Sequence, residues 1–493
     1  MSLKKYYVIF MALGYFSFLQ FGYNSEAMAG NPSLTETSLQ SYHISFKTKS
    51  WDKVRKSLGW FNKNGFDVAG VNRHKFVVEL IVNKKEIEKL KKNGYEGRIV
   101  SISKSGPGIK SLDPQYLNPD KLEARLKELS LLAPEYTKLE VIGRSHEGRA
   151  IYALLVSDSI DLTSDAYLAK PTVLFDGMHH AREIMTSEIV LDVAEHLVEK
   201  LKIADGESLR LVKKWNFWVV PMLNVDGNNI VWKKNSMWRK NAYKKLGKVV
   251  GVDPNRNYSY RWNDCGGSSG YEKSQTYRGP EAASEPEVQA LIGLGDRVHP
   301  ALSVSYHSYS ELILYPYSCR GAYSGENIMM KKLASEMSRQ LPTDKGRGYN
   351  KPGTPWEILY SVDGDSMSYI HAAYGALAFT LEVNNQFQPP YSLRNPTVKK
   401  HRLAWKWLMN RVAKNVLTVR VLNSEGIPVK SKVSISTIKH VEGELPFQTN
   451  KAGYFFRILD PGSYEVTIIT ENKKKLKVSV EMKGSRKLDL VVP

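Results

Sequence analysis

Two short polar segments of this sequence carry side chains that bind metal ions. His180 and Glu183 lie three residues apart, after the apolar run 173–175 and before a helical pattern. A strand-to-helix turn with this spacing can point both side chains at one place, although the pattern alone often arises by chance. His307 follows a second apolar run, 302–306. Two histidines, one glutamate and an open fourth position are the ligand set of a catalytic zinc site, which the sequence therefore predicts.

Other candidate residues could take part in catalysis beside such a metal ion. A lone histidine beside an apolar strand is usually structural, and so is a carboxylate such as Glu382 at the end of the run 376–381. Beside a metal ion, however, Glu382 can act as a general base and acid. Arg239 suits the stabilisation of a developing oxyanion, and Arg256 offers a two-pronged match for a free carboxylate. Such a clamp favours an exopeptidase, because an endopeptidase has no use for it.

These motifs lie in a long alternation of predicted strands and helices. Residues 111–415 contain apolar runs typical of buried strands, such as 217–222, and helical patterns such as 186–200. We therefore predict an α/β catalytic domain over 111–415, with a mixed sheet between layers of helices. Sites in such folds collect at the carboxyl ends of strands, where the candidate ligands fall.

A smaller α/β unit precedes this domain. The apolar pattern of residues 42–102 predicts the element order βαββαβ, a split, ferredoxin-like arrangement. Residues 103–110 combine Gly, Pro and Ser with two lysines, which predicts a linker open to proteolysis. We assign 30–110 to this unit and its linker.

Residues 1–29 have the order of a signal peptide. Lys4 and Lys5 precede an apolar run over 6–21, and a small-x-small site follows at 27–29. An uncleaved anchor is the alternative, but the run is shorter than the roughly 20 residues that span a bilayer. We expect a secreted protein, extracellular or periplasmic, with no integral membrane segment after cleavage.

Residues 416–493 and the overall composition complete the picture. Alternating strands separated by Gly, Pro and Asn turns predict a small β-sandwich over 416–493. The net charge is +20, but no basic stripe is interleaved with aromatic residues, which disfavours nucleic acid as a partner. Cys265 and Cys319 could pair outside the cytoplasm, and the sequence does not show whether they are close enough.

Together these motifs resemble the M14 family of zinc carboxypeptidases over roughly residues 112–415. The stretches 265–270 and 276–279 resemble the bacterial carboxypeptidase T branch of that family. The resemblance implies that His180, Glu183 and His307 hold one zinc ion per catalytic domain. It also implies that Glu382 activates the attacking water and later protonates the leaving amine, and that Arg239 steadies the oxyanion.

The resemblance further implies which residues bind a peptide or protein substrate with a free C-terminus. Asn255, Arg256 and Tyr360 would grip the terminal carboxylate. Arg182 and Tyr309 would line the subsites before the scissile bond. Asp253 would orient His180, as ligating imidazoles generally require.

Four residues, by the same resemblance, would line the pocket for the departing side chain: Ser318, Asp365, Met367 and Thr380. Family members selective for Lys and Arg carry an Asp where this chain has Met367, which argues against strict basic specificity. Asp365 lies where the carboxypeptidase T branch also has an acidic residue. We therefore expect a mixed preference for apolar and basic residues.

The flanking units also have family counterparts. Residues 30–110 occupy the place of a propeptide that covers the active site until an activating protease cuts the linker; a permanent folding-assistance domain is the alternative. Residues 416–493 are similar to carboxypeptidase regulatory-like, transthyretin-like modules, with a stabilising or a binding role equally open. For the whole chain, the alternatives are an enzyme that trims peptidoglycan stem peptides and an inactive zinc-containing binding module.

Overall fold

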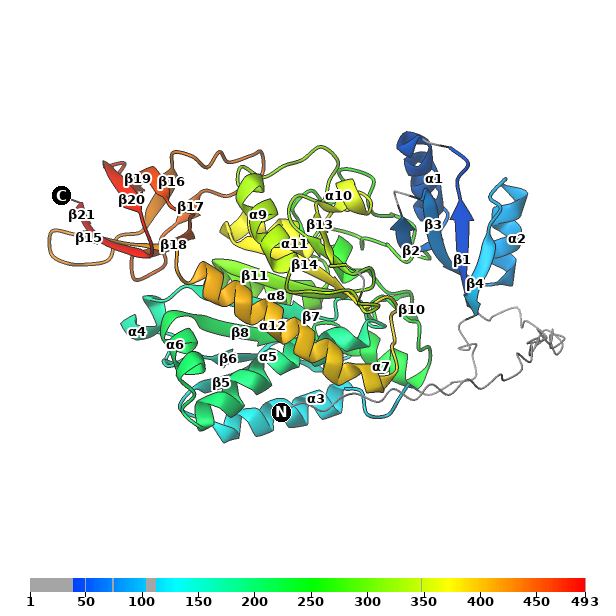
Figure 1. The fold of residues 1–493 in the computed structure, drawn as a ribbon, viewed down its shortest axis with the longest axis horizontal. Helices are drawn as coiled ribbons and strands as arrows, with labels where there is room; N and C mark the ends of the chain where they lie inside the picture. The colour runs from blue at the N-terminus through cyan, green and yellow to red at the C-terminus, as the bar shows by residue number, and fades with distance from the viewer. Residues whose placement is uncertain (1–38, 49, 73–74, 103–111, 347, 493) are drawn as a thin grey trace, which may run out of the picture.

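The computed structural model describes residues 39–48, 50–72, 75–102, 112–346 and 348–492. The predicted signal peptide and the predicted linker over 103–110 lie outside these ranges. The described chain forms a small N-terminal unit, a large central unit and a C-terminal β-rich unit, arranged along the long axis of the molecule (Figure 1).

The N-terminal unit is an antiparallel four-stranded sheet with two helices, in the strand order β2-β3-β1-β4. Its core is apolar and includes Phe61, Phe66 and Leu80. Asn83 caps the second helix in a capping box with Glu86, which fixes where that helix begins. Its elements are β1 (Gln40–Ser45), α1 (Trp51–Lys63), β2 (Asp67–Asn72), β3 (Val77–Val82), α2 (Lys84–Lys92) and β4 (Arg98–Ile102).

The central unit is built on an eight-stranded mixed sheet with the order β13-β12-β14-β11-β7-β8-β6-β5. The middle strands β14, β11, β7 and β8 run parallel to one another. Strands β7, β8 and β11 are buried along their whole length, as parallel strands covered on both faces usually are. The strands are β5 (Thr137–Arg144), β6 (Ala150–Val156), β7 (Thr172–Gly177), β8 (Asn216–Val220), β11 (Leu302–Ser308), β12 (Leu312–Leu314), β13 (Lys351–Gly353) and β14 (Leu377–Val383), with a separate hairpin of β9 (Lys244–Lys245) and β10 (Lys248–Val249).

Helices cover both faces of this sheet. Helix α5 packs on β7, β8 and β11 together with α12, while α8 contacts β5 and α11 contacts β11 and β14. This is the mixed, helix-covered sheet that the alternating sequence pattern predicts. The helices are α3 (Pro119–Leu132), α4 (Asp165–Leu168), α5 (Ile184–Lys202), α6 (Gly206–Lys214), α7 (Val225–Lys233), α8 (Pro286–Val298), α9 (Asn327–Ser338), α10 (Pro355–Ile358), α11 (Ser366–Tyr374) and α12 (Arg394–Val412), with short 3-10 turns η1 (Pro254–Arg256) and η2 (Tyr391–Leu393).

The C-terminal unit consists of a mixed sheet with the order β18-β15-β21, in which β15 and β21 run parallel, and an antiparallel sheet with the order β17-β16-β19-β20. Val419, Val433 and Ile468 belong to the apolar core of this unit. Its strands are β15 (Val416–Asn423), β16 (Ser431–Ile435), β17 (Phe447–Gln448), β18 (Tyr454–Ile458), β19 (Gly462–Thr470), β20 (Lys475–Met482) and β21 (Arg486–Val492).

Candidate active site

The candidate residues gather at the carboxyl ends of three neighbouring parallel strands. His180 and Glu183 lie on the turn between β7 and α5, and His307 lies near the end of β11. Glu382, near the end of β14, is the register partner of His307. Paired residues of adjacent strands point to the same face of a sheet, so the sheet itself places this carboxylate beside the second histidine.

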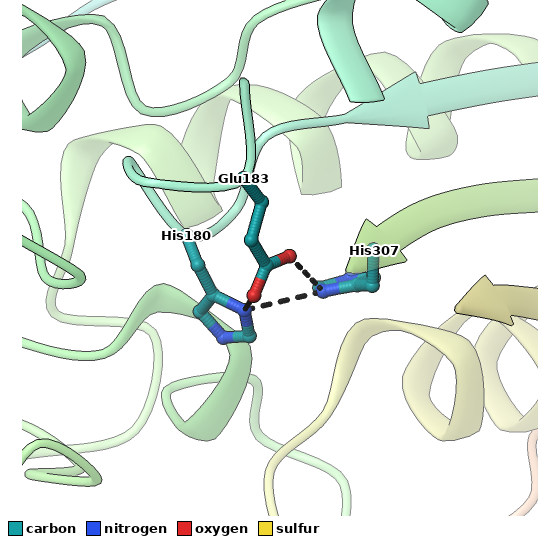
Figure 2. A group of neighbouring side chains, drawn as sticks. All are labelled: His180, Glu183 and His307. Atoms are coloured by element: carbon teal, nitrogen blue, oxygen red, sulfur yellow. Dashed lines mark hydrogen bonds and ion pairs between the residues drawn. The ribbon is translucent and has the colours of Figure 1, made fainter. Parts of the chain in front are cut away.

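His180, Glu183 and His307 form a tight triad of ligand atoms (Figure 2). Nδ1 of His180 lies 2.6 Å from Oε1 of Glu183, and Nδ1 of His307 lies 3.2 Å from Oε2 of Glu183. The two Nδ1 atoms are 3.3 Å apart, and each of the three residues is at most 4% exposed. Two imidazole nitrogens that face each other so closely need a cation or a proton between them. The donor set and its convergence fit zinc.

Neighbouring groups hold these ligands in the protonation states that a metal ion requires. Oδ1 of Asp253 lies 3.2 Å from Nε2 of His180, which keeps the proton on Nε2 and leaves Nδ1 free to ligate. Burial lowers the pKa of His307 and so favours its neutral form. Burial opposes ionisation of Glu183, but attraction and hydrogen bonds from His180 and His307 outweigh it and keep the pKa below its usual range.

The neighbour of the ligating histidine has a different role. Nε2 of His179 lies 2.9 Å from the hydroxyl of Tyr258, and the His179 ring stacks on the His307 ring with centroids 5.2 Å apart. His179 therefore packs against the ring of His307. Of the adjacent pair His179 and His180, only His180 faces Glu183.

Charged groups beside the triad are paired in a fixed arrangement. The guanidinium of Arg239 donates to Oδ2 of Asp253 from Nη2 at 2.8 Å and from Nε at 3.2 Å. Its Nη1 lies 3.9 Å from Oε1 of Glu183. Burial opposes ionisation of Asp253, but Arg239 and His180 outweigh it and hold the pKa well below its usual range. Arg239 is thus anchored with its charge next to the metal ligands.

Glu382 has the opposite electrostatic surroundings from Glu183. Burial raises the pKa of Glu382 to about 8, repulsion from Glu183 adds to this rise, and Arg239 and Arg256 oppose it. A cation held by the triad would lower this pKa again. A carboxyl group whose pKa falls near neutrality is suited to both accept and donate a proton.

Arg256 is positioned by backbone carbonyl groups. Its Nε donates to the carbonyl of Gly267 at 3.0 Å, and its Nη1 donates to the carbonyl of Asn255 at 2.7 Å. The side-chain oxygen of Asn255 accepts from the amide of Ser366 at 2.9 Å. Tyr360 lines the same cavity. The nearest contact of Arg256 to Asp253 is 3.9 Å, so its charge is available to an incoming carboxylate.

The predicted specificity residues line the same cavity: Ser318, Asp365, Met367 and Thr380. Oδ1 of Asp365 accepts from the amide of Ser368 at 2.9 Å, and burial raises the pKa of Asp365. Cys265 and Cys319 form a disulfide with a Cα–Cα distance of 5.7 Å. This settles the pairing that the sequence left open, and it ties the loop of Gly267 to the loop of Ser318.

The N-terminal unit closes the mouth of this cavity. Arg182, which is 1% exposed, donates to both carboxylate oxygens of Asp67 at the start of β2, with Nη2 3.0 Å from Oδ1. Val68 and Ala69 of the same strand line the cavity. The remaining volume is about 50 Å³, whereas open ligand sites usually offer roughly 300–1,000 Å³. Strand β2 therefore takes up part of the space beside the candidate ligands.

The sequence interpretation missed three residues at this mouth. The guanidinium of Arg182 lies 4.0 Å from the ring centroid of Phe387, and the rings of Tyr309 and Phe387 are 4.7 Å apart. Burial raises the pKa of Tyr309. The negative charge of Glu79 on β3 and its hydrogen bond to Tyr309 raise this pKa further. No motif in the sequence around Phe387, Asp67 or Glu79 marks them as site residues, so only the tertiary fold reveals them.

Comparison with known proteins gives this fold and site a family. The sequence model of the zinc carboxypeptidases, Peptidase M14, matches residues 122–404. The chain therefore belongs to the zinc carboxypeptidase family, a family of metal-dependent hydrolases. Among the described residues, none of the helices combines the length and the apolar character needed to cross a membrane.

Individual relatives agree with this assignment. The chain is 32% identical over 250 residues to a metallocarboxypeptidase A-like protein of Trichophyton verrucosum, across 49% of this chain and 56% of that protein. It is 30% identical over 316 residues to carboxypeptidase B of Canis lupus familiaris, across 61% of this chain and 72% of that protein. The crystal structure of carboxypeptidase A from Helicoverpa armigera shares the fold, with a TM-score of 0.63 at 22% identity over 76% of this chain and 97% of that one.

Proposed function

We propose that this protein hydrolyses the C-terminal peptide bond of peptides and proteins. The observation that carries the proposal is one cavity lined by a metal ligand, Glu183, a carboxyl group, Glu382, and a backbone-held cation, Arg256. Zinc in the ligand set of His180, Glu183 and His307 supplies a water nucleophile at neutral pH by lowering the pKa of that water to about 7.

The protein's own groups would carry the remaining steps. Glu382 takes a proton from the attacking water and returns it to the nitrogen of the leaving residue. Arg239 faces the negative charge that develops on the carbonyl oxygen. Arg256, with Asn255 and Tyr360, binds the free carboxylate of the last residue and so aligns the final peptide bond with Glu382.

The pocket supports a mixed preference for the departing side chain. Met367 is 3% exposed and apolar, and Asp365 is 5% exposed and acidic. Because burial raises the pKa of Asp365, the pocket can accept an apolar side chain with this carboxyl protonated. A lysine or arginine side chain would favour the ionised form of Asp365 and pair with it.

We further propose that the N-terminal unit is an inhibitory propeptide and that the chain is exported. The contact of Asp67 with Arg182 and the small remaining cavity support inhibition. An activating protease would cut in or near residues 103–110, which join this unit to the central one. The pattern of residues 1–29 supports secretion.

The test compares peptides with free and amidated C-termini after cleavage of the linker. Uncut protein should be nearly inactive, and cleaved protein should release single residues from free-acid peptides. Amidated peptides should react at least about 100-fold more slowly, because Arg256 would then lack its charged partner. Equal rates on both peptides would rule out the carboxylate clamp. Peptidoglycan stem peptides serve as a third substrate, and exclusive hydrolysis of these would favour the cell-wall alternative.

A further inference from the structure

The loop over residues 436–446, between β16 and β17, packs on the central unit behind the specificity pocket. The amide of Leu445 donates to the carbonyl of Ala372, near the end of α11, at 2.8 Å. A Cβ atom on Gly325 would overlap the carbonyl of Lys439, and one on Gly375 would overlap the ring of Phe447. The loop and the start of β17 therefore pack directly against backbone of the central unit at two glycines, which fixes the position of the loop.

Glu444 is the buried anion of this loop. Its side chain is 7% exposed, and Oε2 accepts from the amide of Val441 at 2.9 Å. Oε1 accepts from the hydroxyl of Tyr317. Burial opposes ionisation of Glu444, but hydrogen bonds from His440 and Tyr317 outweigh it and keep the pKa below its usual range. Glu444 thus presents a fixed negative charge to the central unit.

Tyr317 connects Glu444 to one wall of the pocket. It is fully buried, with its ring 4.9 Å from that of Tyr260 and 5.3 Å from that of His371. The next residue, Ser318, lines the active-site cavity. A shift of the Tyr317 side chain would therefore also move Ser318, because the two residues are adjacent in the chain.

The opposite wall, α11, is held by the same loop. The amide of Leu445, the residue after Glu444, donates to the carbonyl of Ala372 in α11 at 2.8 Å. The amide of Ser318 donates to Oγ of Ser368 at 3.3 Å, and the amide of Ser368 donates to Asp365 at 2.9 Å. Glu444 and the next residue, Leu445, therefore bond to the two walls, and those walls are joined to each other inside the pocket.

We propose that Glu444 is a positioning residue that sets the separation of the two pocket walls, so that the C-terminal unit takes part in choosing the departing side chain. This inference rests on the proposed carboxypeptidase function. A network of shared hydrogen bonds couples its members, so a change at Glu444 acts on the pocket without touching the substrate.

The test uses Glu444→Gln and Tyr317→Phe in the zinc-loaded, linker-cleaved protein that retains its C-terminal unit. The matched control is Glu425→Gln, which changes an exposed carboxylate of the same unit that contacts Ser424. For each protein, kcat and KM are measured on peptides ending in Leu, Phe, Lys or Arg. Zinc content and the unfolding temperature are recorded for every variant.

Both variants should change the ratio of kcat/KM between apolar and basic endings by about three- to tenfold, mainly through KM. The double variant should change the ratio no more than Tyr317→Phe alone, because that variant already removes the hydrogen bond that Glu444→Gln reduces from a charged to a neutral one. The control should keep the ratio and the zinc content of the wild type. A purely structural role would instead lower kcat/KM equally for all endings.

An active wild-type enzyme whose ratio is unchanged in both variants would overturn this inference alone. A wild-type enzyme with no carboxypeptidase activity after linker cleavage would overturn the proposed function and the inference with it. Should Glu444→Gln not fold, Tyr317→Phe decides, because it removes a single hydroxyl and keeps the ring contacts.

Discussion

Two clusters in this molecule use the same side-chain types in opposite proportions. His180, Glu183 and His307 provide two imidazoles and one carboxylate, whereas a second cluster of His146, Glu285 and Glu287 provides one imidazole and two carboxylates. In each cluster, all within the described part of the chain, one potential ligand atom per residue lies within 4.8 Å of the others. The types of side chain and the distances between them therefore do not show by themselves which cluster is a metal site.

The balance of donors and acceptors separates them. In the second cluster, Nδ2 of Asn241 donates to Oε2 of Glu285 at 2.6 Å and to Oε2 of Glu287 at 2.9 Å. Nε2 of His146 lies 2.7 Å from the same oxygen of Glu285, and burial raises the pKa of Glu287 to about 7. The amide group of Asn241 and a proton shared between the carboxyl groups thus stabilise Glu285 and Glu287 side by side without a metal ion. The active-site triad has facing acceptor nitrogens instead, which is the arrangement that a cation completes.

The largest expected effect comes from removing one histidine of each cluster. His307→Ala should lose bound zinc and nearly all hydrolysis, since the metal contributes several kcal/mol and each 1.4 kcal/mol is about tenfold in rate. His146→Ala should keep one zinc ion per chain. Metal analysis of both purified variants checks this. Zinc loss in His146→Ala would show that the second cluster is a metal site after all.

Replacing a carboxyl group beside the triad and one within the second cluster should have the next largest effect. Glu382→Gln, beside the triad, should keep its zinc and lower kcat by about 10²–10⁴-fold, because the proton carrier is gone. Glu287→Gln should leave kcat nearly unchanged. Steady-state kinetics on a free-acid peptide, with zinc content measured in parallel, tests the pair. Normal turnover by Glu382→Gln would contradict the role given to this residue.

A smaller effect is expected from the group that orients the first histidine. Asp253→Asn should weaken zinc binding by about 10–100-fold, because Nε2 of His180 loses its charged acceptor. Competition with a chelator gives the affinity directly. Asp226→Asn is a suitable control, since Asp226 is an equally buried carboxylate that pairs with Arg149. Equal zinc affinities for both variants would mean that Asp253 has no orienting role.

The smallest effect is a change in how stability depends on pH. The pKa of Glu287 is raised from 4.5 to about 7, so between these values the folded protein binds more protons than the unfolded chain. Stability therefore falls as pH rises through this window. Glu287→Gln should flatten that fall. Urea unfolding at pH 4.5, 6 and 7.5 measures it, and parallel curves for the variant and the wild type would contradict the proton-sharing account.

Much of the triad could be predicted from local sequence. His180 and Glu183 follow, and His307 and the neighbouring Glu382 end, apolar runs that become parallel strands, and parallel strands deliver their carboxyl ends to one edge. The second cluster gave no such signal, because His146 lies in a turn and Glu285 and Glu287 lie at the start of a helix. Its assembly depends on the tertiary packing of segments far apart in the chain.

Other features were beyond reach of the sequence for the same reason. The contact of Asp67 with Arg182 joins residues 115 positions apart, and no local pattern encodes it. In the C-terminal unit, the sequence predicted alternating strands over 416–493 but not how these strands divide between two sheets. Strand β20 alternates strictly between polar and apolar residues, which is a local signal, whereas the parallel pairing of β15 with the distant β21 depends on tertiary contacts.

The register between β11 and β14 has a consequence for how this chain can change over time. His307 and Glu382 share a face only because the two strands are aligned residue for residue. Inserting or deleting a single residue within either strand would turn one of the two side chains toward the opposite layer of helices. Length changes should therefore be tolerated in the connecting loops, while these two strands accept only point substitutions.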